Sequence, residues 1–361
     1  MRILLYLLVF CLPTFAQKQD IRSAGKEVEL EKILEGQGVI WGFEFLPGNQ
    51  IIYTEREGTI KIFNSQTKKI TPVEGVPKYA TRGQGGLMDI LLDSDFKKNK
   101  GIYLTYAVEV DGDHTTRVSS ATLDGNKISQ VKQLFQAEPA TGNAEHFGSR
   151  LQIDENRYLF FTIGDRGKRK EAQNLNSHLG KVIRLKTDGS IPNDNPFFGQ
   201  KGKKPEIWSY GHRNPQGLQY DKSTKTLWLQ EHGPRGGDEI NIVVKGKNYG
   251  WPVATFGKEY WGPKIADTHK VGTEQPVYQF TPSIAPGGLL LYKGNRFPGW
   301  KGSLFSAGLA IPQLNRLYKD GSVYKEEKLL TALKKRIRHV KEDAEGYIYI
   351  STDSGEIYRL K

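Results

Sequence analysis

Cysteine is almost absent from this sequence, and so are long apolar stretches. One of the 361 residues is a cysteine, Cys11, and only two are methionine. Cys11 lies in the longest apolar run, from Ile3 to Leu12, which is too short to span a bilayer as a helix. The sequence therefore predicts no transmembrane segment, and it offers thiol chemistry at no position other than Cys11.

The apolar run at the N-terminus has the form of a secretion signal. Arg2 precedes it, and the small residue Ala16 follows it at a suitable cleavage position. We expect residues 1–16 to be a signal peptide, so that the protein is exported and is periplasmic or secreted. Loss of this segment would remove Cys11, and the remaining chain, 17–361, would have to be stable without disulfides.

Several enzyme classes are excluded because their short motifs are missing. The sequence contains no GxGxxG, P-loop, HExxH or GxSxG pattern, which argues against the common dinucleotide, nucleotide, zinc-protease and serine-hydrolase sites. Its seven histidines are scattered and never at metal-pair spacing, which argues against a zinc site.

Aromatic residues and positive charge are both plentiful. The 17 Tyr, 16 Phe and 6 Trp residues can build a large core, which excludes a disordered chain. The formal net charge of +12 has two interpretations, solvated surface lysines or attraction to an anionic ligand or surface. Nucleic acid is not an expected partner, because the chain carries an export signal and no recognition motif.

Strand signals recur along the whole chain after the N-terminus. A unit of one apolar strand, a polar turn and a second strand occurs six times. The first strands of these units are 39–46, 87–92, 150–153, 217–220, 288–292 and 337–340. Such a repeat predicts an all-β fold, a six-bladed β-propeller with four-stranded antiparallel blades forming a single domain over 17–361.

Other segments complete this prediction. The C-terminal strand 356–360 is expected to close the ring with N-terminal sequence, and the insertions 138–145 and 250–275 are expected to be loops on one face. Only two short segments, 171–179 and 326–335, have a helical pattern.

Polar residues gather where the strands of successive units begin or end. In a propeller the innermost strands begin at one mouth of the central channel, so these residues should converge there. The set contains a histidine, a carboxylate to orient it, an amide and three arginines: His146, Asp165, Gln84, Arg213, Arg336 and Arg338. It suits a general base acting on a hydroxyl group beside a polyanionic ligand, because guanidinium groups bind carboxylates in a fork geometry.

Each of these residues also has a structural interpretation. His146 alone could be a packed or capping residue, and Asp165 and Asp238 could close turns. An Arg-x-Arg pair could lie on a solvated strand face. The co-occurrence of all these residues at equivalent positions of the repeat favours a site.

Taken together, these segments resemble the soluble quinoprotein dehydrogenases of the glucose/sorbosone dehydrogenase family, nearest to the aldose sugar dehydrogenases. The resemblance runs from Trp41 to Leu360. It is carried by the strings GQGGLMDI, HFGSRL, FFTIGDRG, PEIWSYGHRNPQGL, EHGPRGGDEIN, NYGWP, SIAP and RIR.

The resemblance implies the oxidation of an aldose at its anomeric carbon to a lactone. Pyrroloquinoline quinone (PQQ) and Ca²⁺ would lie at the central mouth, and an external molecule would accept the electrons. It implies that His146 is the general base, that Asp165 holds it, and that Arg213 stabilises charge on the quinone. Further implied contacts are Gln84 and Glu145 to the sugar; Gln84, Arg213, Asn214, Arg336 and Arg338 to PQQ; and Gly233, Pro234, Glu239 and Tyr249 to calcium.

Within this set, the carbonyls of Gly233 and Pro234 would bind the calcium that accompanies the quinone. Glu239 and the Tyr249 carbonyl would form a second, structural calcium site. The sequence departs from the family at two positions. Ala310 stands where a cofactor-binding lysine is common, and His339 stands where an aspartate is usual.

Two other functions remain open at this point. Six-bladed calcium propellers include lactonases, although those use Asp, Glu and Asn side chains at the channel calcium rather than arginines and a Gly-Pro pair. A propeller can also bind a ligand without catalysis, because fold does not determine function. The alanine at position 310 gives this third possibility some weight.

Overall fold

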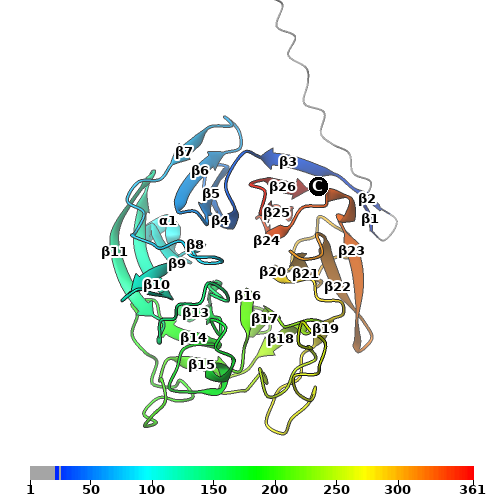
Figure 1. The fold of residues 1–361 in the computed structure, drawn as a ribbon. Helices are drawn as coiled ribbons and strands as arrows, with labels where there is room; N and C mark the ends of the chain where they lie inside the picture. Colours follow the sequence, from blue (N-terminus) through cyan, green and yellow to red (C-terminus); the bar gives the residue numbers. More distant parts are fainter. Residues whose placement is uncertain (1–20, 24–25) are drawn as a thin grey trace, which may run out of the picture.

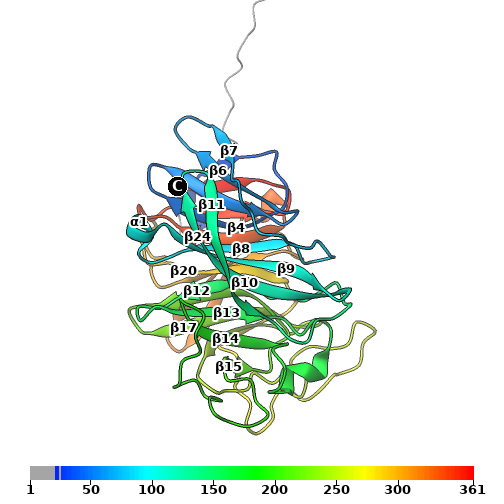
Figure 2. The same cartoon turned by 90° about the vertical axis from the view of Figure 1, so that its left-hand side faces the viewer.

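The protein is a ring of six β-sheets around a central axis (Figure 1). The structure is a computed structural model that describes residues 21–23 and 26–361; the expected signal peptide lies outside the described residues. Each of the six sheets has four antiparallel strands, so the predicted six-bladed propeller is confirmed. The side view shows the blades stacked around the axis, with longer loops extending from one side (Figure 2).

The first three blades follow the chain from the inside of the ring outwards. The first contains β4 (Ile40–Leu46), β5 (Gln50–Glu55), β6 (Thr59–Asn64) and β7 (Ile70–Pro72). The second contains β8 (Leu87–Leu92), β9 (Gly101–Val110), β10 (Asp113–Asp124) and β11 (Lys127–Gln136). The third contains β12 (Leu151–Ile153), β13 (Tyr158–Ile163), β14 (Lys181–Lys186) and β15 (Ile207–Tyr210).

The next two blades have the same order. The fourth contains β16 (Asn214–Asp221), β17 (Thr226–His232), β18 (Asp238–Val243) and β19 (Tyr278–Phe280). The fifth contains β20 (Pro286–Leu291), β21 (Leu304–Gly308), β22 (Leu314–Asp320) and β23 (Val323–Leu329). All six predicted strand–turn–strand units correspond to the first two strands of a blade.

The sixth blade joins the two ends of the chain. It contains β24 (Ile337–Glu342), β25 (Ile348–Thr352), β26 (Ile357–Leu360) and, from the N-terminal side, β3 (Leu30–Leu34). Leu360 pairs with Leu30 and Ile357 with Leu34, which confirms the predicted closure. A separate two-stranded sheet, β1 (Ile21–Ser23) and β2 (Lys26–Val28), precedes β3.

Helices are short in the described part of the chain. They are α1 (Phe96–Asn99) and two 3₁₀ helices, η1 (Arg169–Gln173) and η2 (Thr331–Leu333). None of them is long and apolar enough to cross a membrane.

The two helical predictions fail for different reasons. The predicted helix 326–335 is wrong, because its first half continues β23 in pairing with β22 and only η2 follows. The predicted helix 171–179 is reduced to η1. The Lys181 ammonium donates hydrogen bonds to the carbonyls of Glu171 and Ala172. In a longer helix these carbonyls would accept from backbone N–H groups of the next turn.

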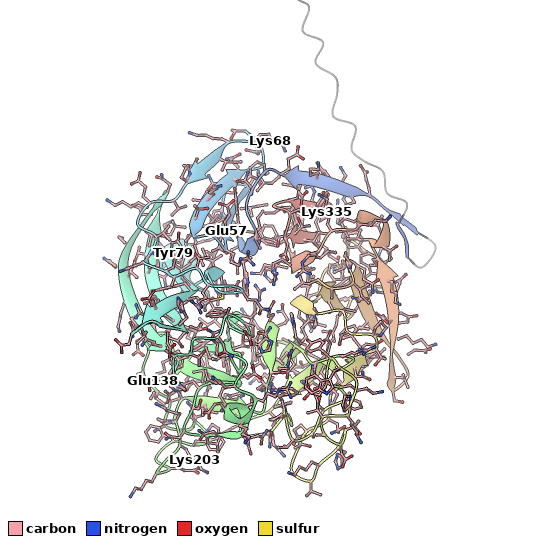
Figure 3. The ribbon with its side chains drawn as sticks, in the orientation of Figure 1. Glu57, Lys68, Tyr79, Glu138, Lys203 and Lys335 are labelled. Carbon is pink, nitrogen blue, oxygen red and sulfur yellow. The ribbon has the colours of Figure 1, made fainter. Side chains whose placement is uncertain are left out.

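Apolar residues fill the space between neighbouring blades. Strands such as β5 and β13 are almost entirely buried, because each face of a middle strand packs against one of the two neighbouring blades. The innermost strands β4, β8, β12, β16, β20 and β24 surround the axis, and their side chains extend toward the centre of the ring (Figure 3). Lys68 and Lys203 lie at its outer edge (Figure 3). One mouth of the channel is therefore framed by the starts of six strands.

Candidate active site

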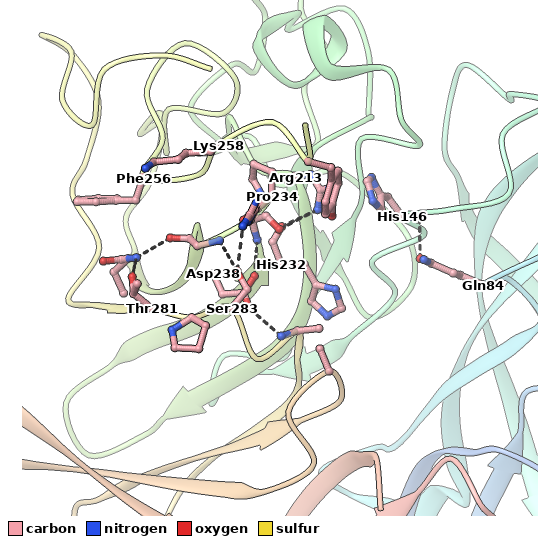
Figure 4. Close-up of a pocket in the computed structure, with 18 residues that line it drawn as sticks. Gln84, His146, Arg213, His232, Pro234, Asp238, Phe256, Lys258, Thr281 and Ser283 are labelled. Carbon is pink, nitrogen blue, oxygen red and sulfur yellow. Dashed lines mark hydrogen bonds between the residues drawn. The ribbon is translucent and has the colours of Figure 1, made fainter. Parts of the chain in front are cut away.

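A cavity of about 710 Å³ lies at the mouth where the innermost strands begin (Figure 4). Such a volume is typical of a pocket that holds a cofactor or small ligand. The predicted site residues that line it are Gln84, His146, Arg213, Gly233 and Pro234, and Ala310 lies in its wall as well. The structure therefore brings together residues that are up to about two thirds of the chain apart.

His146 and Asp165 form a short hydrogen-bonded pair at the edge of this cavity. The His146 Nδ1 lies 2.6 Å from Asp165 Oδ1, and Asp165 is fully buried. The second carboxylate oxygen of Asp165 accepts a hydrogen bond from the indole Nε1 of Trp251 at 2.7 Å. Burial would raise the pKa of Asp165, but the His146 hydrogen bond and the Arg213 charge hold that pKa below its usual value. A charged carboxylate fixes the imidazole so that Nε2 faces away from it.

The backbone around His146 is held in an unusual conformation. His146 has a φ of 55°, in the left-handed region, and its N–H donates to the Gln84 side-chain oxygen at 3.0 Å. The His146 carbonyl would lie 2.0 Å from a Cβ at Gly164, so only glycine fits there. The GDRG turn after β13 therefore permits the close approach that brings Asp165 to the histidine.

Arg213 lies directly before β16 and is buried beside the same pair. Its backbone carbonyl accepts a hydrogen bond from Asp165 N at 2.7 Å, and its guanidinium lies 5.5 Å from the Trp251 ring centre. Its Nη1 donates to the carbonyl of Gly233 at 3.1 Å. Arg213 thus links the histidine side of the cavity to the loop that follows β17.

That loop, 233–237, is held by a buried carboxylate. Asp238 accepts hydrogen bonds from Gly233 N at 2.9 Å and from Ala285 N at 2.7 Å. Burial raises the pKa of Asp238 to about 6. The carbonyl of Pro234 accepts from Gly237 N at 2.7 Å and from Ser283 Oγ at 3.3 Å. The predicted calcium pair therefore belongs to a hydrogen-bonded turn in the cavity wall.

Arg336 and Arg338 are not among the residues that line the cavity. Both form ion pairs with Asp353, at 2.8 Å and 2.7 Å, and these arginines hold the pKa of Asp353 below its usual value despite its burial. Arg336 Nη1 also donates to the carbonyl of Leu309, next to Ala310. Arg336 therefore adjoins the cavity wall, whereas Arg338 reaches across the channel to Gln216 at 2.8 Å.

Two further predicted contacts lie behind the cavity lining. Asn214 is fully buried, with its side-chain oxygen accepting from Gly148 N, while its Nδ2 has no partner among the described residues. Glu145 is half-buried, next to Asn143 on the loop before His146. The unpartnered amide of Asn214 is a donor that a bound ligand could satisfy.

Glu239 and Tyr249, the predicted second calcium ligands, lie apart from the cavity. Glu239 pairs across the sheet with Glu231, and its burial and the Glu231 charge raise its pKa well above the usual value. The nearby buried oxygen of Asn241 has no donor among the described residues. Tyr249 stacks on His212 with ring centres 4.7 Å apart.

Several residues in or beside the cavity were missed by sequence reasoning. Trp251 lies in the NYGWP string, which gave no hint that its indole would reach Asp165. His232 lines the cavity as a neutral ring: burial and the charge of Arg213 hold its pKa well below the usual value, and Nε2 donates to the Pro286 carbonyl. Lys258 and Tyr260 come from the insertion 250–275, whose path the sequence did not reveal.

The donor set of the cavity fits the groups implied by the resemblance. Arg213, Arg235 and Lys258 give its wall a positive charge, and Gly233 and Pro234 belong to the same wall. Their neutral carbonyls accept hydrogen bonds from Arg213, and from Gly237 N and Ser283 Oγ, respectively. Among the described residues, no three His, Cys, Asp or Glu side chains come together as a metal-binding group. A calcium ion would here rest mainly on carbonyls and on oxygens of its ligand, which Ca²⁺ accepts readily.

The fold and the site together indicate an enzyme built on a six-bladed propeller, with a His–Asp pair and a cationic cavity at one mouth of the channel. The family model for glucose/sorbosone dehydrogenases matches residues 38–359, and the chain belongs to that family.

Individual relatives cover nearly the whole chain. Aldose sugar dehydrogenase YliI of Escherichia coli is 38% identical over 97% of both chains. Quinoprotein glucose dehydrogenase B of Acinetobacter calcoaceticus is 30% identical over 86% of this chain and 68% of its own. The crystal structure of the E. coli soluble aldose sugar dehydrogenase in its apo form superimposes with a TM-score of 0.89 at 39% identity, covering 92% of this chain and 99% of that chain.

Proposed function

We propose that this protein oxidises aldose sugars at the anomeric carbon to lactones, with PQQ and Ca²⁺ as cofactors and an external electron acceptor. The observation that carries the proposal is the pair of half-buried His146 and buried Asp165 at the edge of a cationic cavity of about 710 Å³. Family membership and the names of the relatives support it. Residues 1–16 support export to the periplasm or outside the cell.

His146 is the general base. Its Nδ1 donates to the charged Asp165, so Nε2 keeps a free lone pair that can accept the proton of the anomeric hydroxyl. Gln84 uses its side-chain oxygen to hold His146 N, which leaves its amide nitrogen for the sugar. Glu145, beside His146, is the second residue that we assign to sugar binding.

The cofactor would lie against the cationic side of the cavity. Arg213 and Gln84 would bind it from the cavity wall, and Asn214, Arg336 and Arg338, which do not line the cavity, are assigned to it as well. Gly233 and Pro234 would hold its calcium. When bound, PQQ supplies the two-electron acceptor for the hydride of the anomeric carbon, and calcium makes it more electrophilic. Arg213 lies between His146 and Gly233, where it can stabilise negative charge that develops during the reaction.

We assign a second, structural calcium to Glu239 and the Tyr249 carbonyl. Two neighbouring buried carboxylates, Glu231 and Glu239, repel each other, and the oxygen of Asn241 lacks a donor among the described residues. A cation near Glu239 would offset the repulsion between the two carboxylates and would give the Asn241 oxygen a partner.

The test is a titration of the purified protein with PQQ in the presence of Ca²⁺, followed by a panel of aldoses and a dye acceptor. We expect a change in the quinone absorbance on binding, and dye reduction only when quinone, calcium and aldose are all present. His146→Ala should bind PQQ and lose about 10²- to 10⁴-fold in kcat. Glu239→Gln should bind PQQ normally but lose the stabilisation that Ca²⁺ gives against heat.

Other results would redirect the assignment. Full turnover by His146→Ala would remove the histidine from its role. Lactone hydrolysis without quinone would indicate a hydrolase. Absence of quinone binding in the presence of calcium would indicate a binding propeller, a result that Ala310 in the cavity wall makes worth testing.

A further inference from the structure

Below the active-site cavity, the central channel contains a ring of six positions at one level. A second cavity, of about 450 Å³, opens at the far mouth, and every innermost strand contributes to its lining. The lining includes Glu44, Leu91, Gln152, Gln219, Leu290 and Lys341. A second set of residues lies two positions earlier on the same six strands. They are Gly42, Asp89, Arg150, Gly217, Gly288 and His339.

Three of these six positions are glycines, and the other three carry polar side chains that are almost inaccessible. Asp89, Arg150 and His339 are 3%, 1% and 4% exposed. A Cβ at Gly42 would meet Asp89 Oδ1 at 2.5 Å, and one at Gly288 would meet His339 Nδ1 at 2.1 Å. Gly42 and Gly288 therefore let the neighbouring inner strands, which carry Asp89 and His339, approach closely.

Arg150 has a free donor at this level. Its Nη1 binds Asp89 Oδ1 at 2.8 Å, its Nε binds the Gln216 carbonyl at 2.9 Å, and its guanidinium lies 4.2 Å from the Trp41 ring centre. Its Nη2 is buried and has no partner among the described residues. A guanidinium nitrogen can only donate, so Nη2 requires an acceptor.

His339 also has an unpartnered atom. Its ring packs edge-on against Phe43, and its Nδ1 is buried without a partner in the described part of the chain. Burial and the positive charges of Arg150, Lys341 and Arg338 hold its pKa well below the usual value, so the ring is neutral. A neutral imidazole can present an N–H at Nδ1.

The acidic groups near the channel are already engaged. Asp89 binds Arg150 with one oxygen and Leu151 N with the other, at 2.9 Å. Glu44 is paired with Lys341, and Asp353 is paired with Arg336 and Arg338. No carboxylate is left to accept from Arg150 Nη2, and the charges that act on His339 are positive.

We propose that the channel holds a small monovalent inorganic anion, such as chloride, between Arg150 Nη2 and His339 Nδ1. The anion would accept a hydrogen bond from each group and would offset the positive potential around His339. This site goes beyond the proposed function, and neither residue belongs to the machinery assigned to sugar oxidation.

The direct test is crystallographic, with bromide as the probe. Crystals of the wild-type protein are soaked in sodium bromide, and anomalous data are collected at the bromine edge. We expect a peak within hydrogen-bonding distance of Arg150 Nη2 and His339 Nδ1. An ordered water at that position without any anomalous signal would overturn the proposal.

A test in solution uses His339→Asp, in which a carboxylate of the protein replaces the negative charge of the proposed anion. Wild-type thermal unfolding in bromide, compared with gluconate at equal ionic strength, should show a midpoint higher by roughly 2 °C at saturating anion. His339→Asp should unfold at the same temperature in both salts, because its carboxylate can bind Arg150. The control His269→Asp makes the same charge change on an exposed loop and should keep the bromide response.

Equal midpoints of the wild-type protein in both salts, or an undiminished bromide response in a folded His339→Asp protein, would contradict the site. Because quinone binding is not part of either measurement, these outcomes are independent of those that test the enzymatic proposal.

Discussion

At the scale of single residues, Asp165 has the most constrained position in the site. Its carboxylate accepts hydrogen bonds from His146, from Gly167 N and from the Trp251 indole, and it is fully buried. These contacts determine which ring nitrogen of His146 faces the cavity. Loss of the negative charge would therefore act on the reaction through the histidine.

We predict that Asp165→Asn lowers kcat by roughly 10²- to 10⁴-fold while KM changes little, because an amide can donate to Nδ1 and reverse the tautomer of His146. Steady-state kinetics of the PQQ-loaded enzyme measures this split. Asp188→Asn, at an exposed turn, is the control and should behave like the wild type. An Asp165→Asn enzyme with wild-type kcat would show that His146 needs no partner.

Lys181 is a second residue with an unusual setting. It is fully buried, and its ammonium donates to the carbonyls of Glu171, Ala172 and Leu179. Burial lowers its pKa to about 7, although the charges of Glu171 and Asp165 oppose this shift. In the unfolded chain a lysine keeps its proton up to about pH 10.

The sign of the pH dependence follows from these pKa values. Between about pH 7 and about pH 10 the unfolded state binds more protons at Lys181 than the folded state, so the free energy of unfolding should rise with pH. We predict that Lys181→Met reduces this rise, measured by urea unfolding at about pH 6 and about pH 9. Lys186→Met, exposed on the same strand, should leave it intact; an equal effect of both substitutions would contradict the assignment.

At the scale of elements, the loop 255–267 forms part of the cavity wall. Lys258 makes bridges to Arg235 and Lys264, and a tight turn places Glu259 N against the Pro263 carbonyl. Arg169, on η1, forms a two-pronged ion pair with Glu259, with Nη2 to Oε2 at 2.8 Å. This pair fastens the loop that carries Lys258 and Tyr260 to the third blade.

We predict that Glu259→Gln raises KM for the aldose several-fold and leaves kcat nearly unchanged, because the loop shapes the cavity and does not touch His146. The matched control is Asp267→Asn, which removes an exposed ion pair with Lys264 in the same loop and should have no effect. A change in kcat at constant KM would place Glu259 in a different role.

The elements also show where sequence reasoning succeeds and fails. Inner and middle strands such as β5 and β13 were predictable, because short runs of Ile, Tyr and Phe between turn residues indicate buried strands. The segment 326–335 was misread because β23 is an outer strand with four consecutive charged residues, 325–328, and such a run resembles part of a short helix. The loop 255–267 has no periodicity, so its place in the cavity wall depends on long-range contacts alone.

At the scale of the whole molecule, the repeat was sufficient to predict both the ring and the mouth where His146, Arg213 and Gly233 meet. The roles of Trp251 and Lys258, and the pairing of Arg336 and Arg338 with Asp353, were beyond the sequence. Each depends on which side chains meet across blades that are distant in the chain. The ring itself depends on one closing interaction, β26 with β3.

Leu360 tests whether that closing interaction holds the ring as one cooperative unit. It is fully buried on β26, opposite Leu30, within the core shared by the fifth and sixth blades. We predict that Leu360→Ala lowers the free energy of unfolding by about 2–5 kcal/mol without changing the urea dependence.

The readout must distinguish opening of one blade from unfolding of the ring. Far-UV circular dichroism and the fluorescence of tryptophans such as Trp41 and Trp228, which lie in different blades, should report the same shifted midpoint in Leu360→Ala. Leu333→Ala, at a half-buried position on η2 packed against the same core, should cost less. If Leu360→Ala instead gave two separate transitions, the sixth blade would open on its own, and closure would not be what stabilises the other five.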